Sequence, residues 1–248
     1  MDRRISILLV ALSLPLLAAG CGSNHSARKS TSTTTAQGAP VKTIDPANFV
    51  RTIDNPYFPL RPGSVWRYRG VKDGKPTVDV QKATNRTKDI LGVHATVVTD
   101  QLFQHGKVVE DTIDWYAQDR QGNVWYFGED TKELDRHGKV TSTEGSWQSG
   151  VKGAGPGIFM PAHLRVGQSF AQEHYRGQAE DHFQVLDLAS KVTTPYASSR
   201  RALRTKEWTP LEPGVIDNKY YLRGVGTVDE ITRKGPFERN TLVSFKRG

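Results

Sequence analysis

The chain has 248 residues, a formal net charge of +8 from 34 lysines and arginines against 26 aspartates and glutamates, and a single cysteine. The single cysteine excludes a disulfide within one chain. The basic residues are scattered, whereas nucleic acid would require a continuous basic face with aromatic residues among them, so we expect no nucleic-acid partner. We expect a solvated basic surface, with a mild attraction to anionic headgroups or anionic envelope polymers.

The beginning of the chain has the pattern of an export signal. Asp2-Arg3-Arg4 is a short charged region, and the apolar run from Ile5 to Leu17 is too short to span a bilayer comfortably. The pattern predicts a signal peptide over residues 1–20 and therefore an exported protein.

The end of that run, Leu17-Ala18-Ala19-Gly20-Cys21, resembles the lipobox of bacterial lipoproteins. The resemblance implies cleavage before Cys21, acylation of that cysteine, and anchoring at the outer face of a bacterial membrane. The sole cysteine of the chain stands at this position, which supports a dedicated role for it. An ordinary secretory signal with a chance cysteine is the alternative.

Residues 21–47 are expected to form the lipidated N-terminus and a flexible tether. The stretch from Gly22 to Lys42 is rich in Ser, Thr and Ala and shows no hydrophobic periodicity. Such a composition cannot bury enough apolar surface to order itself, and about 20 residues of it reach roughly 25 Å. A β-rich globular domain is then predicted over residues 48–248.

The domain opens on a stiff, extended segment. The stretch from Ile53 to Gly63 contains three prolines, which exclude a helix there. Tyr57, Phe58 and Leu60 are expected to pin this segment against the core.

The stretch from Glu110 to Asp130 organises the rest of the domain. Its residues alternate as in a strand, and Asp119-Arg120-Gln121-Gly122 then supplies a tight turn in which glycine accepts a positive φ. The return strand is rich in β-branched and aromatic residues. At roughly 150–250 Å² per buried aromatic ring, the hairpin is expected to seed the core through Trp115, Tyr116, Trp125 and Tyr126.

The same turn chemistry recurs at Asp135-Arg136-His137-Gly138, and more loosely at residues 104–107 and 72–75. Glycine-closed turns between alternating segments predict an antiparallel meander. One segment, 198–206, is moderately favourable for a helix but overlaps a candidate strand. The candidate strands cover residues 64–70, 77–87, 93–103, 107–118, 123–127, 131–134, 139–143, 168–175, 179–188, 201–208, 218–222, 226–232 and 240–245.

The strand pattern breaks between Gly145 and Gly167, a stretch with six glycines, two prolines and no alternation. A long glycine-rich connection in a compact domain is usually functional or mobile. It contains an apolar patch, which is expected to plug a barrel mouth or to lie over an open sheet face without belonging to the sheet: Ile158, Phe159 and Met160.

The closing segment, residues 220–228, has an aromatic pair before a G-x-G, and a last strand returns through Leu242-Val243-Ser244-Phe245. Together with the lipobox, it resembles the lipoprotein-localisation carriers and the related mycobacterial lipid-carrier lipoproteins. The resemblance implies an antiparallel half-barrel around a hydrophobic cavity, and a closed lipocalin-like barrel is the alternative. The expected fold class is therefore all-β: a single antiparallel meander forming a strongly curved sheet, half-barrel or barrel.

Carboxylates cluster in and around the central hairpin, at Glu110, Asp111, Asp114, Asp119, Glu129 and Asp130. A hydrolase with paired carboxylates or a Ca²⁺ site could be built from such residues, but the sequence lacks a D-x-[DN]-x-[DN]-G loop. We expect these carboxylates to lie on a solvent-facing side of the strands and in turns.

Two other pairs, Glu173-His174 and Asp181-His182, flank a turn, with His163 upstream, and contain the residue types that bind zinc. Adjacent strand residues point to opposite faces, so we predict exposed polar residues there and no metal site. Nucleophile, phosphate-loop and dinucleotide motifs do not occur in the sequence. We therefore predict neither an enzyme nor a bound cofactor.

The sequence predicts an exported, membrane-anchored lipoprotein that binds or carries an apolar ligand such as a lipid. The membrane is reached through Cys21, and the ligand through a hairpin face that carries the tryptophans while Tyr116 and Tyr126 lie on the other face. Two alternatives stay open: a structural or interaction module of the envelope with a solid core, and, less expected, a hydrolase. The candidate ligand-binding residues are Trp115, Trp125, Phe127, Ile158, Phe159 and Met160.

Overall fold

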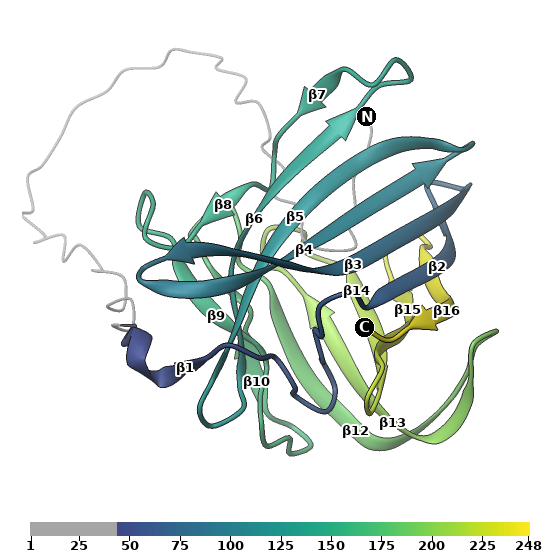
Figure 1. Ribbon diagram of the computed structural model, residues 1–248. Helices are drawn as coiled ribbons and strands as arrows, with labels where there is room; N and C mark the ends of the chain where they lie inside the picture. Colours follow the sequence, from purple (N-terminus) through teal and green to yellow (C-terminus); the bar gives the residue numbers. More distant parts are fainter. Residues whose placement is uncertain (1–43) are drawn as a thin grey trace, which may run out of the picture.

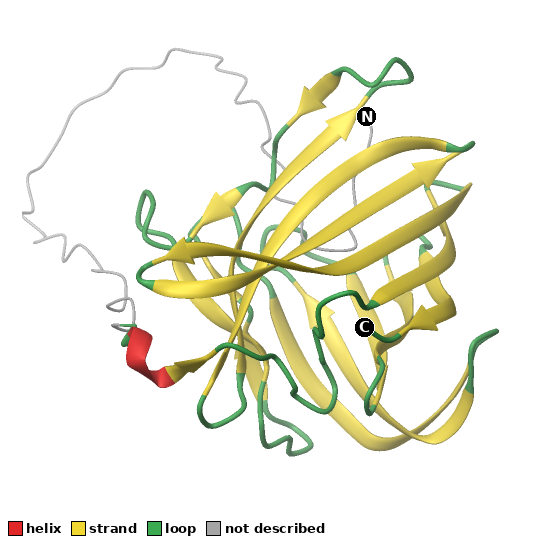
Figure 2. Ribbon diagram, viewed as in Figure 1, coloured by secondary structure: helices red, strands yellow, loops and turns green. Residues whose placement is uncertain are grey.

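The computed structural model describes residues 44–248, and this part of the chain is almost entirely β-structure (Figure 2). Its one helical element is the 3-10 turn η1 (Pro46–Asn48), and within residues 44–248 no helix has the length and apolar character that crossing a membrane requires. The strands are β1 (Phe49–Val50), β2 (Val65–Lys72), β3 (Lys75–Ile90), β4 (Val93–Gln104), β5 (Lys107–Asp119), β6 (Val124–Leu134), β7 (Val140–Ser142), β8 (Trp147–Gln148), β9 (Gly155–Met160), β10 (Ser169–Ala171), β11 (Glu173–His174), β12 (His182–Thr193), β13 (Ser198–Trp208), β14 (Ile216–Leu222), β15 (Gly226–Lys234) and β16 (Arg239–Lys246).

The strands pair antiparallel and curl into a nearly closed barrel (Figure 1). The main path runs β10-β12-β13-β14-β15-β16-β2-β3-β4-β5-β6-β9-β11, and β1, β7 and β8 pair with β5 or β6 beside it. The two ends of the path meet, because Gln172 alone separates β10 from β11 in the chain. The predicted all-β antiparallel meander with strong curvature is thus confirmed.

The alternating side chains of the strands build two apolar clusters. The inner cluster faces the barrel interior and draws on strands all around it, with Trp66 of β2, Tyr116 of β5, Tyr126 of β6 and Tyr221 of β14 among its members. The outer cluster lies on the opposite face of β3 to β6. Its buried members are Ile90, Val93, Ala95, Val97, Trp115, Ala117, Trp125 and Phe127.

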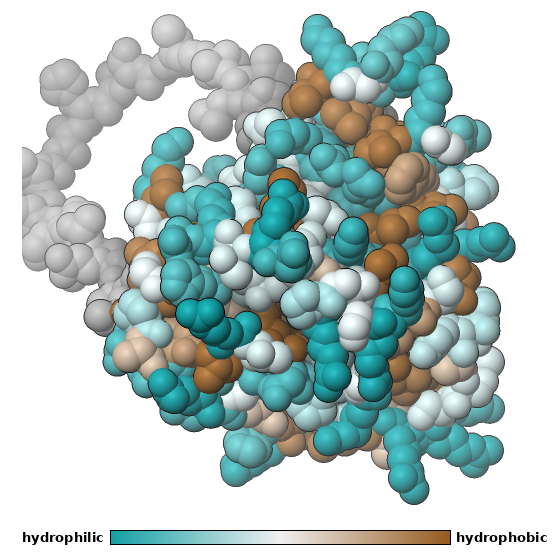
Figure 3. Space-filling view, in the orientation of Figure 1, coloured by the Kyte–Doolittle hydropathy of each residue, from teal (hydrophilic) through white to brown (hydrophobic). Residues whose placement is uncertain are grey.

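The first described residues cover the outer cluster. Ile44 and Phe49 pack against it, and the Phe49 ring lies edge-on to Trp125 and Phe127, with centroids 6.2 and 5.6 Å apart. This explains why both faces of the central hairpin are apolar: one faces the barrel interior and the other faces the N-terminal segment. The rest of the surface in view is mainly hydrophilic, with smaller apolar patches between polar side chains (Figure 3).

The predicted turns form as expected. In the central hairpin the Gly122 amide donates to the Asp119 carbonyl at 2.9 Å, and Gly122 has a φ of +91°. The same bond joins Gly138 to Asp135 at 3.0 Å. Because a residue with a side chain is strained at such a φ, the glycine spacing of the sequence was a sufficient signal for these turns.

The predicted break between the strands 123–127 and 131–134 is wrong, and the predicted strand 168–175 is interrupted at Gln172. Strand β6 runs without a break from Val124 to Leu134, although the sequence suggested two separate strands there. Gly128 takes a φ of +128° within it and pairs with Trp115, and the register shifts by one residue at this point. The glycine marks a β-bulge inside one strand, not the end of a strand.

The prediction that the glycine-rich stretch 145–167 contains no strand is also wrong. It contains β8 and β9, and β9 pairs with β6 on one side and β11 on the other. A Cβ on Gly157 would lie 2.3 Å from the carbonyl carbon and oxygen of Gln172, so glycine is required for this close approach of two backbones. The apolar patch 158–160 therefore belongs to the sheet. The helix-favourable segment 198–206 lies in β13.

The proline-rich segment 53–63 crosses one end of the barrel. Its backbone is hydrogen-bonded to three parts of the barrel. The backbone amides of Asp54 and Asn55 donate to Gln118 Oε1. The Gly224 amide donates to the Pro56 carbonyl, and the Gly63 amide donates to the Ala83 carbonyl. Leu60 belongs to the inner cluster, and Tyr57 and Phe58 pack against it, as expected.

Candidate ligand cavity

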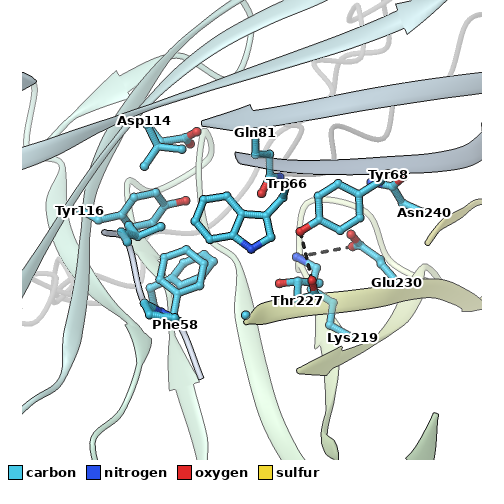
Figure 4. Close-up of a pocket in the computed structure, with 15 residues that line it drawn as sticks. Phe58, Trp66, Tyr68, Gln81, Asp114, Tyr116, Lys219, Thr227, Glu230 and Asn240 are labelled. Atoms are coloured by element: carbon cyan, nitrogen blue, oxygen red, sulfur yellow. Dashed lines mark hydrogen bonds and ion pairs between the residues drawn. The ribbon is translucent and has the colours of Figure 1, made fainter. Parts of the chain in front are cut away.

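A small cavity lies inside the barrel beneath the segment 53–63. Its volume is about 40 Å³, room for roughly three water molecules at about 10–15 Å³ of accessible volume each. Five aromatic rings line it together with a few polar side chains (Figure 4). The aromatic lining residues are Phe58, Trp66, Tyr68, Tyr116 and Phe159, and the charged or amide-bearing ones are Gln81, Asp114, Lys219, Glu230 and Asn240.

The aromatic rings are held by one another and by backbone acceptors. Phe58 lies 5.1 Å from Tyr116 and 4.5 Å from Phe159 between ring centroids. Trp66 Nε1 donates to the Val225 carbonyl at 2.7 Å, and the Tyr68 hydroxyl donates to the Thr227 carbonyl at 3.1 Å. These bonds satisfy the polar atoms of Trp66 and Tyr68 and leave their ring faces to the cavity.

Asp114 is the carboxylate at one end of the cavity. It is fully buried, and its Oδ1 accepts a hydrogen bond from the Tyr126 hydroxyl at 2.7 Å. Its Oδ2 is buried without a hydrogen-bond partner among residues 44–248. Burial, reinforced by the charge of Asp100, raises the pKa of Asp114 to about 8.

Lys219 occupies the other end and is compensated by two carboxylates. Its Nζ lies 2.8 Å from Glu207 Oε2 and 3.4 Å from Glu230 Oε1. Burial lowers the pKa of Lys219, but these two neighbouring carboxylates outweigh burial and raise it overall. In Figure 4 Trp66 stands between this group and the pair formed by Asp114 and Tyr116.

Further carboxylates continue around the interior beyond the cavity. Asp79 accepts from Asn240 Nδ2 at 2.8 Å and Asp100 accepts from Gln81 Nε2 at 2.9 Å. Glu173 accepts from Trp147 Nε1 at 3.0 Å, whereas both carboxylate oxygens of Glu129 are buried without a partner in the described part of the chain. Burial is the largest cause that raises the pKa of Asp79, Glu129 and Glu173.

The expectation that the hairpin carboxylates face solvent is therefore wrong for Asp114 and Glu129, which are 0% and 1% exposed. Both lie on the same face of the hairpin as Tyr116, and this face is buried from Thr112 to Gln118 on β5. Asp119 is a turn residue as expected, and it also accepts a bond from Trp125 Nε1 at 2.9 Å. The remaining carboxylates, Glu110, Asp111 and Asp130, are partly exposed and bond to Lys72, Gln101 and Lys132 respectively.

The structure separates the sequence-predicted binding residues into two groups. Phe159 lines the cavity, and Met160 is buried in the inner cluster. Trp115, Trp125 and Phe127 belong to the outer cluster, with Ile158 packed against it. The hairpin thus presents Tyr116 to the cavity and its tryptophans to the N-terminal segment, opposite to the expected orientation. Whether any of these residues contacts a ligand stays a prediction.

Sequence reasoning missed Trp66 and Tyr68 as cavity residues, although W-x-Y in β2 places both on one strand face. It also missed Lys219, which no local motif distinguishes from other strand lysines. The sequence could not show which face of the central hairpin points into the barrel, because both faces are rich in aromatic residues.

No group of three or more His, Cys, Asp or Glu residues with metal-binding geometry occurs within residues 44–248. Glu173 is buried while His174 is exposed, so these neighbours point to opposite faces as predicted, but the expectation that both are exposed polar residues is wrong for Glu173. Partial burial of the imidazoles lowers the pKa of His174 and of His182.

No protein-family model matches the chain, and no curated protein matches it. Among solved structures, one from Bacteroides fragilis is described as an exported protein with a YmcC-like fold. It aligns with a TM-score of 0.45 and 13% sequence identity, and the alignment covers 77% of this chain and 99% of the other chain. Another, from Parabacteroides distasonis, is described as a lipoprotein, with a TM-score of 0.40, 10% identity and the same two coverages. Neither description names an enzymatic activity.

Proposed function

We propose that the protein is an exported, lipid-anchored protein of the bacterial envelope whose barrel binds a small ligand that has an apolar part. The observation that carries this proposal is the interior cavity lined by five aromatic rings beneath the segment 53–63. Concave, mostly apolar sites with a few placed polar groups are typical ligand sites. Export and anchoring depend on the lipobox, and both the signal peptide and Cys21 lie outside the described residues.

The cavity volume limits the ligand class. A drug-sized ligand site usually encloses about 300–1,000 Å³, whereas this cavity has a volume of about 40 Å³. A whole lipid chain would require several interior side chains to move, and the carboxylates among them would then face an acyl chain. The geometry favours a ligand that inserts one small group, so transport of an enclosed lipid is the less supported form of the proposal.

Ligand binding is tested through Trp66, which lines the cavity, with Trp115 of the outer cluster as its matched control. We expect 1-butanol to change the tryptophan emission of the wild type and of Trp115→Phe, and to leave that of Trp66→Phe unchanged. Palmitate is expected to have no such effect. If neither compound changes the emission, ligand binding in the cavity is contradicted. If palmitate alone changes it, and only when Trp66 is present, the protein is better described as a lipid carrier.

An envelope interaction module is the second candidate, and the filled interior favours it. The inner cluster leaves only the volume of a few water molecules, as expected of a barrel that serves as a rigid support. This function predicts no response of Trp66 to any small compound, so the same titration separates the two candidates.

Anchoring is tested by Cys21→Ala. We expect the variant to be released from membranes, because the Ser- and Thr-rich tether contains no other group that partitions into lipid and several acyl chains are needed for stable anchoring. The measurement is sedimentation with membranes after a salt wash, and Ser23→Ala, two residues further along, is the control. A variant that still sediments would remove the lipobox assignment.

A further inference from the structure

The cavity holds more acceptor capacity than its own residues satisfy. Two of its lining residues, Asp114 and Asn240, carry buried oxygens with no hydrogen-bond partner among the described residues: Oδ2 and Oδ1. The amide orientation of Asn240 is fixed because its Nδ2 donates to Asp79 at 2.8 Å. With Asp114 ionised, both atoms can only accept. An occupant that completes this site therefore has to donate hydrogen bonds.

The charges around the cavity favour an occupant of positive charge. Lys219 is the basic residue of the lining, and its charge is engaged by Glu207 and Glu230. Burial and the charges of Asp100 and Glu110 raise the pKa of Asp114, whereas the hydroxyls of Tyr126 and Tyr116 lower it. A further carboxyl, that of Glu129, lies directly opposite on β6. No lysine or arginine among residues 44–248 forms an ion pair with Asp114. A cation at this end would supply the missing counter-charge.

The rings beside Asp114 suit a cation as well. Tyr116, Trp66, Phe58 and Phe159 line the same cavity, and desolvated aromatic faces attract ammonium groups, Trp most strongly. The cavity volume of about 40 Å³ admits a single compact head group. An attached alkyl part would point toward Phe58, Pro59 and Leu60 of the segment that crosses the barrel end.

We propose that this cavity binds the ammonium group of a small organic amine, with Asp114 Oδ2 as its acceptor and the rings of Trp66 and Tyr116 around it. The inference rests on the proposed small-ligand function and narrows its ligand class. Asp114 is the specificity-determining residue: it distinguishes an alkylammonium ion from a neutral compound of the same shape.

The test compares n-butylammonium with 1-butanol by isothermal titration calorimetry at pH 8, because the raised pKa of Asp114 leaves a larger share of this carboxyl ionised there than at neutral pH. We expect butylammonium to bind at least about tenfold more tightly, since a hydrogen bond to a charged group is stronger than one between neutral groups. The wild-type comparison needs no variant and so does not depend on any variant folding.

Asp114→Asn is compared with Asp111→Asn on the same strand, because Asp114 lines the cavity whereas Asp111 is partly exposed and bonded to Gln101. Asp114→Asn is expected to lose the preference for butylammonium, and Asp111→Asn to retain it within about twofold. Thermal melts report whether each variant is folded.

Equal affinity of the wild type for the two compounds would overturn the amine proposal and leave the small-ligand function standing. Binding of neither compound would remove the small-ligand function itself. A preference that survives in folded Asp114→Asn would overturn the role of Asp114.

Discussion

The free energy of unfolding is expected to fall as the pH rises from 5 to 8. Burial raises the pKa of Asp114 to about 8, whereas unfolded carboxylates titrate near pH 4. Between these values the folded chain holds protons that the unfolded chain has released, so stability decreases with pH by up to about 1.4 kcal/mol per pH unit for each such group. This contribution is fully present below pH 4 and is lost as the pH passes the folded value.

Other buried groups also affect how the free energy of unfolding changes between pH 5 and 8. Glu129 and Glu173 add to the fall, because burial raises the pKa of each. His174 and His182 oppose it below about pH 6.5, since burial lowers their pKa and the unfolded chain then binds more protons. Lys219 titrates above this range because its net pKa is raised. These carboxylates outnumber the two histidines and are more deeply buried, so the net expectation is that the free energy of unfolding falls.

Urea unfolding followed by tryptophan emission at pH 5, 6.5 and 8 and constant ionic strength checks this expectation. Asp114→Asn should reduce the slope, whereas Asp111→Asn, on the partly exposed side of β5, should leave it unchanged. A stability that stays level or increases over this range would mean that the interior carboxylates are ionised in the folded protein.

Gly157→Ala is expected to destabilise the barrel by about 3 kcal/mol or more, since overpacking against backbone cannot be relieved by a side-chain rotation. The new Cβ would meet the Gln172 carbonyl group at 2.3 Å and the Ala171 oxygen at 2.6 Å, where β9 approaches the junction of β10 and β11. That junction closes the barrel, so the effect should spread to the whole domain.

Gly153→Ala is the matched control. Gly153 lies in the same glycine-rich stretch, and a Cβ there meets nothing within 4 Å, although its φ of +83° is unfavourable for alanine. We expect Gly153→Ala to lower the free energy of unfolding by about 1–2 kcal/mol. For Gly157→Ala we expect the larger loss given above, which corresponds to a decrease in melting temperature of roughly 6–12 °C. Equal melting temperatures for the two variants would show that the closure tolerates a side chain at residue 157.

The sequence by itself determined the strand content and most of the turns of this protein. Glycine at a fixed distance from aspartate, as in Asp119 to Gly122, demands a backbone conformation that few other residues adopt, so the turn follows from local chemistry alone. Alternation of side chains likewise marks a strand without reference to its partners. For the same reason, prolines in the segment 53–63 predicted an extended chain.

The tertiary structure alone decided which face of each strand lies inside and where the sheet closes. Trp115 and Tyr116 are equally suited to a core, and only the covering of the outer cluster by Phe49, far away in the chain, places the tyrosine inside. Gly157 serves a contact with Gln172 that no local pattern contains. Asp114 reads as a surface residue by composition, and it becomes a buried acceptor because strands distant in sequence enclose it and withhold water from it.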